Sequence, residues 1–500
     1  MKIFHPKIAR EFLLISPKPS RRNYHKSPET DKSYPSQLPE SMSKVPELMC
    51  TQHPDSTVRI TVQMEVEEAI ASFAVYGCDE VMVDYEGKLT PYSQPRDVVK
   101  AAVEADLPVG EGFTVTVRLP NPRLEGEDRL VLALTAAALA NRYAGAAIGA
   151  QAVEWLVLPM LEDPQEILSV HAVALSVGRA LGAGGEPQLV PLLESVESQL
   201  RIGEYLSALA RLYGDGLEGR ALRVFVGKSD AAVMSGHAAS ALSVRYALWE
   251  AARFSREKGA AVAPIIGMGS PTFRGGLNNP SLVSLEVEVY RGFMTATVQS
   301  AIRYDSQPST YRSVVERLRL GRGGSPDPVG GEALSIVREA ERWYTSVLRR
   351  YADALRLYAK EVPQTRDRLL WTEYGRSLCV DGAELSLPRA ITFVAAWYSM
   401  GLPPTFLDAP YLLKLGREDG LDHLLHLLPN LREEWSYEAQ FFVPRVAEKA
   451  LGEELVQAVK EAMALLGVDG SACEEYARLI EQRNSGFGLV AAARWRGFLG

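Results

Sequence analysis

The stretch LRVFVGKSD, residues 222–230, is a short apolar and β-branched run that ends in polar residues, and a helix-like segment follows it. The same unit recurs from residue 80 to residue 305. The six other runs are EVMVDYEGK (80–88), FTVTVRLP (113–120), VEWLVLPM (153–160), QLVPLLES (188–195), VAPIIGMGS (262–270) and ATVQSAIRYD (296–305). Intervening segments such as 163–182 combine apolar i, i+3, i+4 spacing with an acidic start and a glycine stop, as amphipathic helices do. Seven such units predict parallel strands joined by helical crossovers.

The polar residues at the strand ends distinguish between the two folds that such units build. A doubly wound sheet gathers ligand contacts only near its switch point, whereas a barrel brings every strand end to one face. Here a polar or glycine residue follows nearly every predicted strand: Asp84, Glu86, Arg118, Glu194, Asp230, Gly267 with Gly269, and Gln299. We therefore predict an α/β fold of the (β/α)8 TIM-barrel type.

Three regions are expected along the chain. Residues 1–41 are rich in Ser, Pro, Lys and Arg and poor in large apolar residues, which predicts a disordered extension. A transit peptide is the alternative, but we favour an upstream extension of the reading frame. Residues 42–330 are expected to form the barrel, and residues 331–500, which are mostly helical in pattern, are expected to pack on it.

Composition excludes several classes of partner. The 500 residues carry 54 basic and 62 acidic side chains, a net charge of −8, without a dense basic stripe, so we expect no nucleic-acid or membrane partner. No unbroken apolar run approaches the roughly 20 residues of a membrane helix. The four cysteines, Cys50, Cys78, Cys379 and Cys473, lie far apart and form no C-x-x-C pair, which argues against a zinc site and a secreted disulfide framework and favours the cytoplasm.

Two carboxylates follow consecutive predicted strands. Glu194 ends one run and Asp230 ends the next, so their side chains could together hold one Mg²⁺ or Mn²⁺ and leave positions for water and substrate oxygens. The alternative is that each caps the helix that follows it.

A glycine-rich loop, GMGSPTFRGGL (267–277), carries one arginine, Arg274. Glycines permit close approach of the backbone to an anion, and the guanidinium could close on phosphate or carboxylate, although an ordinary flexible loop has the same composition. Arg118 and Arg389 are further candidate anion clamps, or else ordinary surface arginines. A second glycine-rich stretch, GRGGS (321–325), is read as a flexible loop.

His53 lies in CTQHPDST (50–57). On local composition alone this histidine is a turn residue held beside Pro54. An unperturbed pKa of about 6.5 would nevertheless suit proton transfer at neutral pH.

Six motifs in order resemble the phosphoenolpyruvate carboxylase family, and most closely its short archaeal type. They are TQHPD (51–55), VPLLES (190–195), GKSDAAVMSG (227–236), GMGSPTFRGG (267–276), TVQSAIRYD (297–305) and PRAITFVAAWYSMGLPP (388–404). The resemblance implies a barrel enzyme that joins bicarbonate to phosphoenolpyruvate with Mg²⁺ or Mn²⁺, gives oxaloacetate and phosphate, and assembles as a homotetramer.

The resemblance also implies roles for individual residues. Glu194 and Asp230 match the metal ligands, His53 matches the catalytic histidine, and Arg274 matches the arginine of a mobile loop. Arg118 is a looser match to a catalytic arginine. Residues assigned to substrate binding are Arg389, Gln299, Gly275 and Gly276.

Departures from the long enzymes of the family leave questions open. Ile266 and Met268 stand where those enzymes carry a histidine and an arginine, and an arginine is replaced near Gly401. These losses leave open which group orients bicarbonate. A separate open question concerns Asp84 and Glu86, which either line the site or start the next loop. Two other functions remain in play: a metal-dependent lyase of the citrate or malyl type, and an inactive scaffold subunit.

Overall fold

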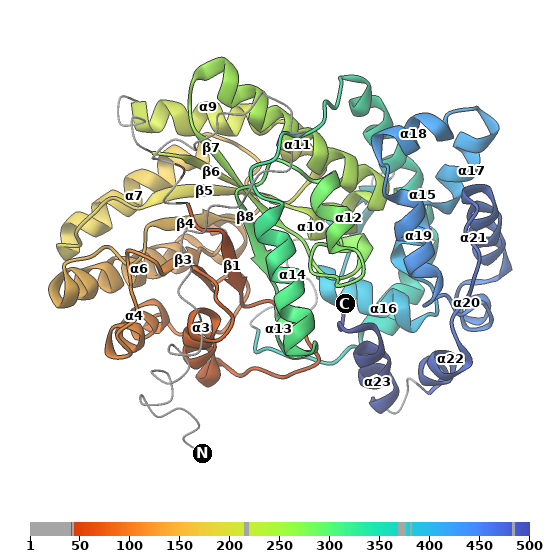
Figure 1. Ribbon diagram of the computed structural model, residues 1–500, viewed down its shortest axis with the longest axis horizontal. Helices are drawn as coiled ribbons and strands as arrows, with labels where there is room; N and C mark the ends of the chain where they lie inside the picture. The colour runs from red at the N-terminus through yellow and green to blue at the C-terminus, as the bar shows by residue number, and fades with distance from the viewer. Residues whose placement is uncertain (1–41, 43–44, 215–219, 369–376, 381–382, 483–485) are drawn as a thin grey trace, which may run out of the picture.

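A computed structural model describes residue 42 and residues 45–214, 220–368, 377–380, 383–482 and 486–500. Its centre is a closed barrel of eight parallel strands (Figure 1). The strands are β1 (Leu48–Thr51), β2 (Glu80–Asp84), β3 (Thr114–Arg118), β4 (Trp155–Leu158), β5 (Gln188–Leu193), β6 (Leu222–Gly227), β7 (Val262–Gly267) and β8 (Thr295–Val298). The barrel confirms the predicted fold class. Residues 1–41, where we expect an extension, lie outside the described residues.

The strand that closes the barrel is the one that the sequence did not reveal. β1 has only four residues and pairs in parallel with both β2 and β8, with Met49 opposite Glu80 on one side and Thr297 on the other. A run this short carries too little periodicity to be recognised. The last predicted strand was too long, because residues 300–304 form helix α13 (Ser300–Tyr304) and not strand.

A ring of helices surrounds the barrel. Its members, in chain order, are η1 (Val62–Met64), α3 (Glu65–Ala74), α4 (Gln94–Glu104), α5 (Pro122–Glu125), α6 (Glu127–Ile148), α7 (Glu166–Leu181), α8 (Val196–Leu200), α9 (Ile202–Tyr213), α10 (Lys228–Ser235), α11 (His237–Lys258), η3 (Thr272–Arg274), α12 (Val283–Val289), α13 and α14 (Pro308–Leu320). Apolar side chains from most of these helices and from the outer face of the barrel form one buried cluster.

Helix α6 bears on the prediction that no unbroken apolar run is long enough for a membrane helix. It is the one described helix that is long and apolar enough to cross a membrane, by length and composition only. Its alanine-rich sequence includes Arg142, so no unbroken run exists in the sequence. Leu130, Ala133 and Leu134 of α6 are buried in the cluster between helices and barrel, whereas Val131 and Leu132 are exposed, so one face of α6 packs on the protein.

A second group of helices lies beside the barrel, at the right of Figure 1. It comprises α15 (Glu332–Ala359), α16 (Ala390–Ser399), η4 (Pro404–Asp408), α17 (Ala409–Arg417), α18 (Leu421–Leu427), α19 (Leu431–Ala439), α20 (Pro444–Leu451), α21 (Glu453–Leu466), α22 (Glu474–Glu481) and α23 (Phe487–Arg496), with a hairpin of β9 (Ser377–Val380) and β10 (Ala383–Ser386). These helices share a buried cluster with α10 and α11, in which Ala231 and Leu242 join Tyr344 and Trp397. Residues from this group can therefore reach the barrel mouth.

The inside of the barrel is filled by side chains and not by solvent. Met49, Met82, Trp155 and Phe225 belong to an apolar cluster of the barrel interior. Near the strand starts, the Arg223 guanidinium donates to both carboxylate oxygens of Glu80 at 2.9 and 2.8 Å and stacks 4.2 Å from the Trp155 ring. Bidentate geometry of this kind satisfies the hydrogen bonds of both buried charged groups. The amino-terminal ends of the strands are therefore held rigidly, and they support the carboxyl-terminal ends.

Two of the cysteines form a disulfide that the sequence did not reveal. Cys50 on β1 and Cys78, just before β2, form a buried disulfide with Cα atoms 5.8 Å apart. The two cysteines are 28 residues apart in sequence, and they meet only because β1 and β2 are adjacent parallel strands, so their spacing gave no sign of this pair.

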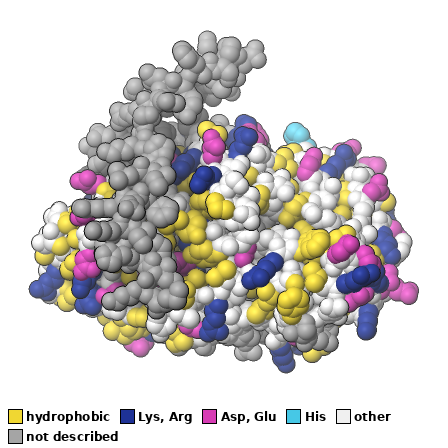
Figure 2. All heavy atoms as spheres, turned by 60° about the horizontal axis from the view of Figure 1, so that its bottom comes forward, with side chains coloured by type: hydrophobic (Ala, Val, Ile, Leu, Met, Phe, Trp, Pro, Cys, Tyr) yellow, Lys and Arg dark blue, Asp and Glu magenta, His cyan; other side chains and the backbone are white. Residues whose placement is uncertain are grey.

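The surface agrees with the even charge distribution of the sequence. On the face shown in Figure 2, basic, acidic and apolar side chains are interspersed, without a continuous basic stripe.

Candidate active site

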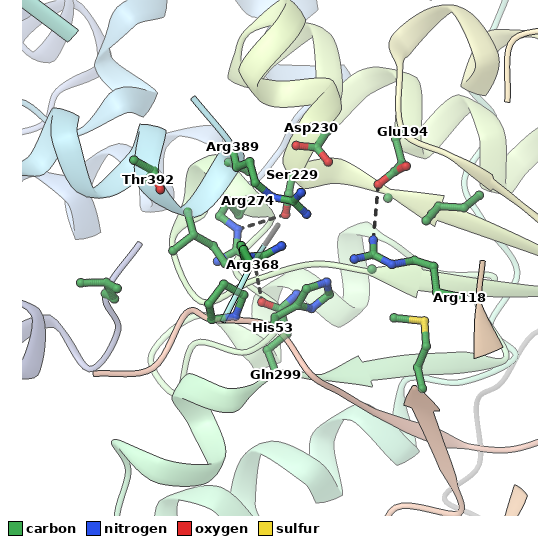
Figure 3. Close-up of a pocket in the computed structure, with 18 of the residues that line it drawn as sticks. His53, Arg118, Glu194, Ser229, Asp230, Arg274, Gln299, Arg368, Arg389 and Thr392 are labelled. Carbon is green, nitrogen blue, oxygen red and sulfur yellow. Dashed lines mark hydrogen bonds and ion pairs between the residues drawn. The ribbon is translucent and has the colours of Figure 1, made fainter. Parts of the chain in front are cut away.

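A pocket opens at the carboxyl ends of the barrel strands, where the second helical group meets the barrel (Figure 3). Seven of the nine residues singled out from the sequence line it: His53, Arg118, Glu194, Asp230, Arg274, Gln299 and Arg389. Gly275 and Gly276 do not. Polar residues that the sequence analysis did not single out also line it: Ser229, Arg368 and Thr392.

His53 follows β1 directly. Its Nδ1 lies 2.8 Å from the Thr51 hydroxyl, and its carbonyl accepts a hydrogen bond from Arg366 Nε at 3.2 Å and another from the Ser300 hydroxyl. Burial, and then the positive charge of Arg118, lower the pKa of His53 well below its usual value. The lowered pKa favours the unprotonated imidazole at neutral pH, which is the form that has a nitrogen free to accept a proton.

Arg118, at the end of β3, is held by two carboxylates. It donates from Nε and Nη2 to the two oxygens of Asp84, both at 2.8 Å, and its Nη1 lies 2.6 Å from Glu86 Oε2. Although burial opposes it, Asp84 and Glu86 raise the pKa of Arg118 well above its ordinary value. Asp84 and Glu86 therefore lie behind Arg118 and fix its orientation; neither lines the pocket.

Glu194 and Asp230 face the pocket from neighbouring strand ends. Glu194 Oε2 accepts a hydrogen bond from the Met160 N–H at 3.1 Å, and Oε1 lies 3.9 Å from Arg118 Nη1. Neither carboxylate caps the helix that follows, because Ser195 is the N-cap of α8 and Gly227 is the N-cap of α10. The capping alternative is thereby removed.

The carboxylate oxygens of Glu194 and Asp230 can be compared with the ligands that a divalent cation requires. Among the described residues, no group of three or more His, Cys, Asp and Glu side chains could hold an ion. Two carboxylates at the rim of a pocket nevertheless fit Mg²⁺ or Mn²⁺, which prefer oxygen ligands and usually keep several positions for water and substrate. Glu194 and Asp230 are thus the residues that would hold such an ion.

Arg274 comes from the short turn η3 between β7 and α12. Its Nε donates to the Ser229 hydroxyl at 3.0 Å and its Nη2 to Gln299 Oε1 at 2.6 Å, while Nη1 donates to the Gly500 carbonyl and lies 3.6 Å from Asp55 Oδ2. Burial lowers the pKa of Arg274, against the opposing charges of Asp55 and Asp230.

The glycine-rich turn is packed, with Thr272 and Phe273 fully buried and Arg274 buried except where it meets the pocket. Gly275 has φ +102°, and a Cβ atom there would lie 2.3 Å from Met268 Sδ. Gly275 and Gly276 therefore form the left-handed turn behind Arg274, which differs from the substrate contact that we assigned to them.

Side chains from the second helical group hold this turn in place. Glu438 of α19 accepts hydrogen bonds from the Thr272 hydroxyl at 2.5 Å and from the Tyr398 hydroxyl at 2.7 Å. Burial raises the pKa of Glu438 to about 7. From the barrel side, Lys228 Nζ donates to the Phe273 carbonyl at 3.0 Å.

The positions that depart from the long enzymes lie outside the pocket. Ile266 and Met268 are fully buried and do not line it, and a Cβ atom at Gly401 would lie 2.8 Å from the Val443 carbonyl. The GRGGS stretch is at the opposite end of the barrel, because Arg322 Nε donates to the Met294 carbonyl just before β8. It takes no part in this site.

A family model described as phosphoenolpyruvate carboxylase matches residues 45–500. The chain belongs to the phosphoenolpyruvate carboxylase family. A relative of that name from Thermofilum pendens is 52% identical over 466 residues, covering 91% of this chain and 100% of the relative. Relatives of the same name from Pyrobaculum arsenaticum and Methanosarcina mazei are 44% identical (92% of this chain, 100% of the relative) and 32% identical (84% and 88%). The family resemblance is confirmed.

Solved structures are more distant. A Haloferax volcanii malate synthase in a pyruvate and acetyl-CoA ternary complex has a TM-score of 0.41 at 13% identity, covering 83% of this chain and 97% of that one. An HpcH/HpaI aldolase/citrate lyase family protein from Burkholderia cenocepacia has a TM-score of 0.34 at 15% identity, covering 55% and 95%.

Proposed function

We propose that this protein converts phosphoenolpyruvate and bicarbonate to oxaloacetate and phosphate. The observation that carries the proposal is the convergence, in one pocket, of a neutral histidine, an acidic pair and several arginines. Membership of the phosphoenolpyruvate carboxylase family supports it. The pocket has the charges that a trianionic substrate and a second anion require.

Substrate binding is assigned to the arginines. Each guanidinium offers paired donors to a carboxylate or a phosphate, and the pocket arginines lie in a buried setting where such bonds are strong. Arg118 and Arg274 are already oriented by Asp84 and by Gln299, so little ordering is required when the substrate arrives.

The first chemical step transfers the phosphoryl group. A bicarbonate oxygen attacks phosphorus, the bond from phosphorus to the enol oxygen breaks, and carboxyphosphate and the enolate of pyruvate result. Mg²⁺ or Mn²⁺ held by Glu194 and Asp230 would supply positive charge to the developing enolate oxygen. Arg274 stabilises the charge of the transferring group.

The second step releases and captures carbon dioxide. Neutral His53 accepts the proton of the carboxyphosphate carboxyl group, the carbon to oxygen bond beside phosphorus breaks, and phosphate and CO₂ form. The methylene carbon of the enolate then attacks CO₂ to give oxaloacetate. Met82, Leu192 and Phe225 line the same pocket and exclude water that would protonate the enolate to pyruvate.

The remaining features implied by the resemblance are assembly as a homotetramer and a cytoplasmic location. We propose that the protein is a homotetramer and that it is cytoplasmic. Sedimentation of the purified chain would measure the first, and a tetramer mass is the expected result.

The test of function is oxaloacetate formation coupled to malate dehydrogenase, followed as NADH oxidation. Turnover should require phosphoenolpyruvate, bicarbonate and Mg²⁺ together, and omission of any one should abolish it. Folded, metal-supplied protein that gave no oxaloacetate but cleaved a citryl or malyl thioester would replace the carboxylase with the lyase. Inactivity towards both substrates would indicate a scaffold subunit.

A further inference from the structure

Arg368 is a pocket arginine that lies outside the sequence motifs. It comes from an extended segment that follows α15, and its side chain lies between Arg274, Arg389 and His53 (Figure 3). The segment is tied to the histidine loop, because the Thr365 hydroxyl donates to the Pro54 carbonyl at 2.9 Å and Arg366 Nε donates to the His53 carbonyl. Arg368 is thus placed by the same contacts that place His53.

Within the described residues, Arg368 forms no ion pair with an acidic side chain, unlike two other pocket arginines. Arg118 contacts Asp84 and Glu86, and Arg274 contacts Asp55. Nη1 of Arg368 is buried and has no hydrogen-bond partner within the described part of the chain. Burial, and next the charge of Arg389, lower the pKa of Arg368 well below its ordinary value, and the charges of Asp84 and Glu86 only partly offset this. A buried donor without an acceptor is costly, and an anionic ligand would relieve the cost.

The beginning of α16 faces the same place. Arg389 is its N-cap residue, and Ala390, Ile391 and Thr392 of its first turn line the pocket. The first intrahelical hydrogen bond is donated by the Phe393 N–H to the Arg389 carbonyl at 2.8 Å. The N–H groups of residues 390–392 come before it and therefore have no acceptor within the helix. Free N–H groups and the helix dipole make such a terminus attractive to anions, phosphate above all.

We propose that Arg368 and the first turn of α16 together bind the phosphoryl group that passes from phosphoenolpyruvate to bicarbonate. The inference rests on the proposed function. Arg368 contacts the non-bridging phosphoryl oxygens, while the bond to the enol oxygen breaks and the bond to bicarbonate forms. Arg368 is therefore a catalytic residue.

Phosphate fits this site better than bicarbonate does. A phosphoryl group carries about two negative charges at neutral pH, whereas bicarbonate carries one, and here two guanidinium groups and a helix terminus converge. The same groups would hold the phosphate product after CO₂ has left. Inorganic phosphate is accordingly a probe of the site that needs no turnover.

The experiment compares Arg368→Gln with Arg368→Lys and with the matched control Arg59→Gln. Arg59 is largely exposed and pairs with Asp367 at 3.1 Å, so its replacement perturbs the same segment without entering the pocket. Phosphate affinity is measured by calorimetry and as inhibition competitive with phosphoenolpyruvate. KM values for both substrates and kcat are measured with the coupled assay.

Loss of a hydrogen bond to a charged group corresponds to a roughly 10- to 100-fold effect. For Arg368→Gln we expect phosphate affinity and kcat/KM for phosphoenolpyruvate to fall by that factor, with KM for bicarbonate changed less than about threefold. Arg368→Lys should recover part of the loss, because one charge returns without the paired donors. Arg59→Gln should match the parent protein.

Unchanged phosphate affinity in folded Arg368→Gln would overturn the proposal, and so would a defect confined to the bicarbonate KM. If the parent protein itself formed no oxaloacetate, the proposed function would fail. Calorimetry with phosphate would still show whether the anion site exists, because that measurement does not depend on turnover.

Discussion

The imidazole of His53 lies in the electrostatic field of Arg118, Arg274 and Arg368, and these cations reinforce the effect of burial on its pKa. The folded protein therefore binds a proton at His53 less readily than the unfolded chain does. Because the unfolded chain takes up a proton below about pH 6.5, the stabilising contribution of neutral His53 is complete above that pH and is lost as the pH falls.

We predict that His53 titrates below pH 6.5 in the ligand-free protein. Carbon-13 labelling of histidine and NMR titration would measure it, with the resonance of His53 assigned as the one absent from His53→Asn. Oxaloacetate formation by His53→Asn should fall at least about 100-fold, as expected when a general acid or base is removed. A His53 signal that titrates at or above the usual value would contradict the predicted lowering of its pKa by burial and the neighbouring arginines.

For the acidic pair we predict that Asp230→Asn abolishes activity at low metal concentration and leaves the fold intact. Replacing a carboxylate ligand by an amide removes charge from the site while keeping its shape, so the apparent affinity for Mn²⁺ should fall at least about 10-fold. Electron paramagnetic resonance of free Mn²⁺ gives the affinity directly. Asp422→Asn, an exposed acid in the first turn of α18, is the control. Full activity and full Mn²⁺ affinity in Asp230→Asn would exclude this metal site.

Single residues were predictable from the sequence where a motif marked them. His53, Glu194, Asp230 and Arg274 each lie in a short motif after a strand, and all four reach the pocket. Arg368 lies in a segment with no strand or helix pattern, so nothing local marked it. Asp55 was visible beside His53, but its contacts with Arg274 and with the Ser300 hydroxyl depend on three separate loops meeting.

At the scale of elements, the turn η3 has to be glycine-rich for steric reasons. Gly275 has a positive φ, and its Cα lies against the Met268 side chain, so any Cβ atom both strains the backbone and overlaps sulfur. The turn holds Arg274 against Gln299 and Ser229, so displacement of the turn moves the guanidinium.

We predict that Gly275→Ala lowers stability by at least about 1–2 kcal/mol and reduces oxaloacetate formation by more than stability alone explains. Thermal unfolding and the coupled assay measure the two effects. The control is Gly145→Ala in α6, where a Cβ atom meets nothing within 4 Å. That change should leave activity alone and stabilise the helix by about 0.5–1 kcal/mol. Wild-type activity and stability in Gly275→Ala would show that the turn tolerates a side chain.

Elements with a strong pattern were predicted well, and short ones were not. All seven apolar runs contain a strand, because each is a short, β-branched apolar run that a polar or glycine residue ends. β1 escaped notice at four residues, although barrel closure depends on it. The Cys50–Cys78 disulfide escaped notice for the same reason, since it joins this strand to the approach to β2.

At the scale of the whole molecule, the pocket is built by two regions far apart in sequence. The barrel supplies His53, the acidic pair and Arg118, and the residues after 360 supply Arg368, Arg389 and the first turn of α16. The sequence predicted that the later helices pack on the barrel, but it held no sign that Glu438 would hold the Thr272 turn. Contacts of this kind arise only from tertiary packing, which periodicity does not encode.

The central claim is that bicarbonate attacks phosphorus in this pocket and then delivers CO₂ to the enolate. Turnover with phosphoenolpyruvate and ¹⁸O-labelled bicarbonate, followed by mass spectrometry of both products, tests it most directly. If the account is right, each phosphate carries one ¹⁸O atom and the new carboxylate of oxaloacetate carries two. Phosphate without label, formed together with labelled oxaloacetate, would mean that bicarbonate never bonds to phosphorus, and the account would be wrong.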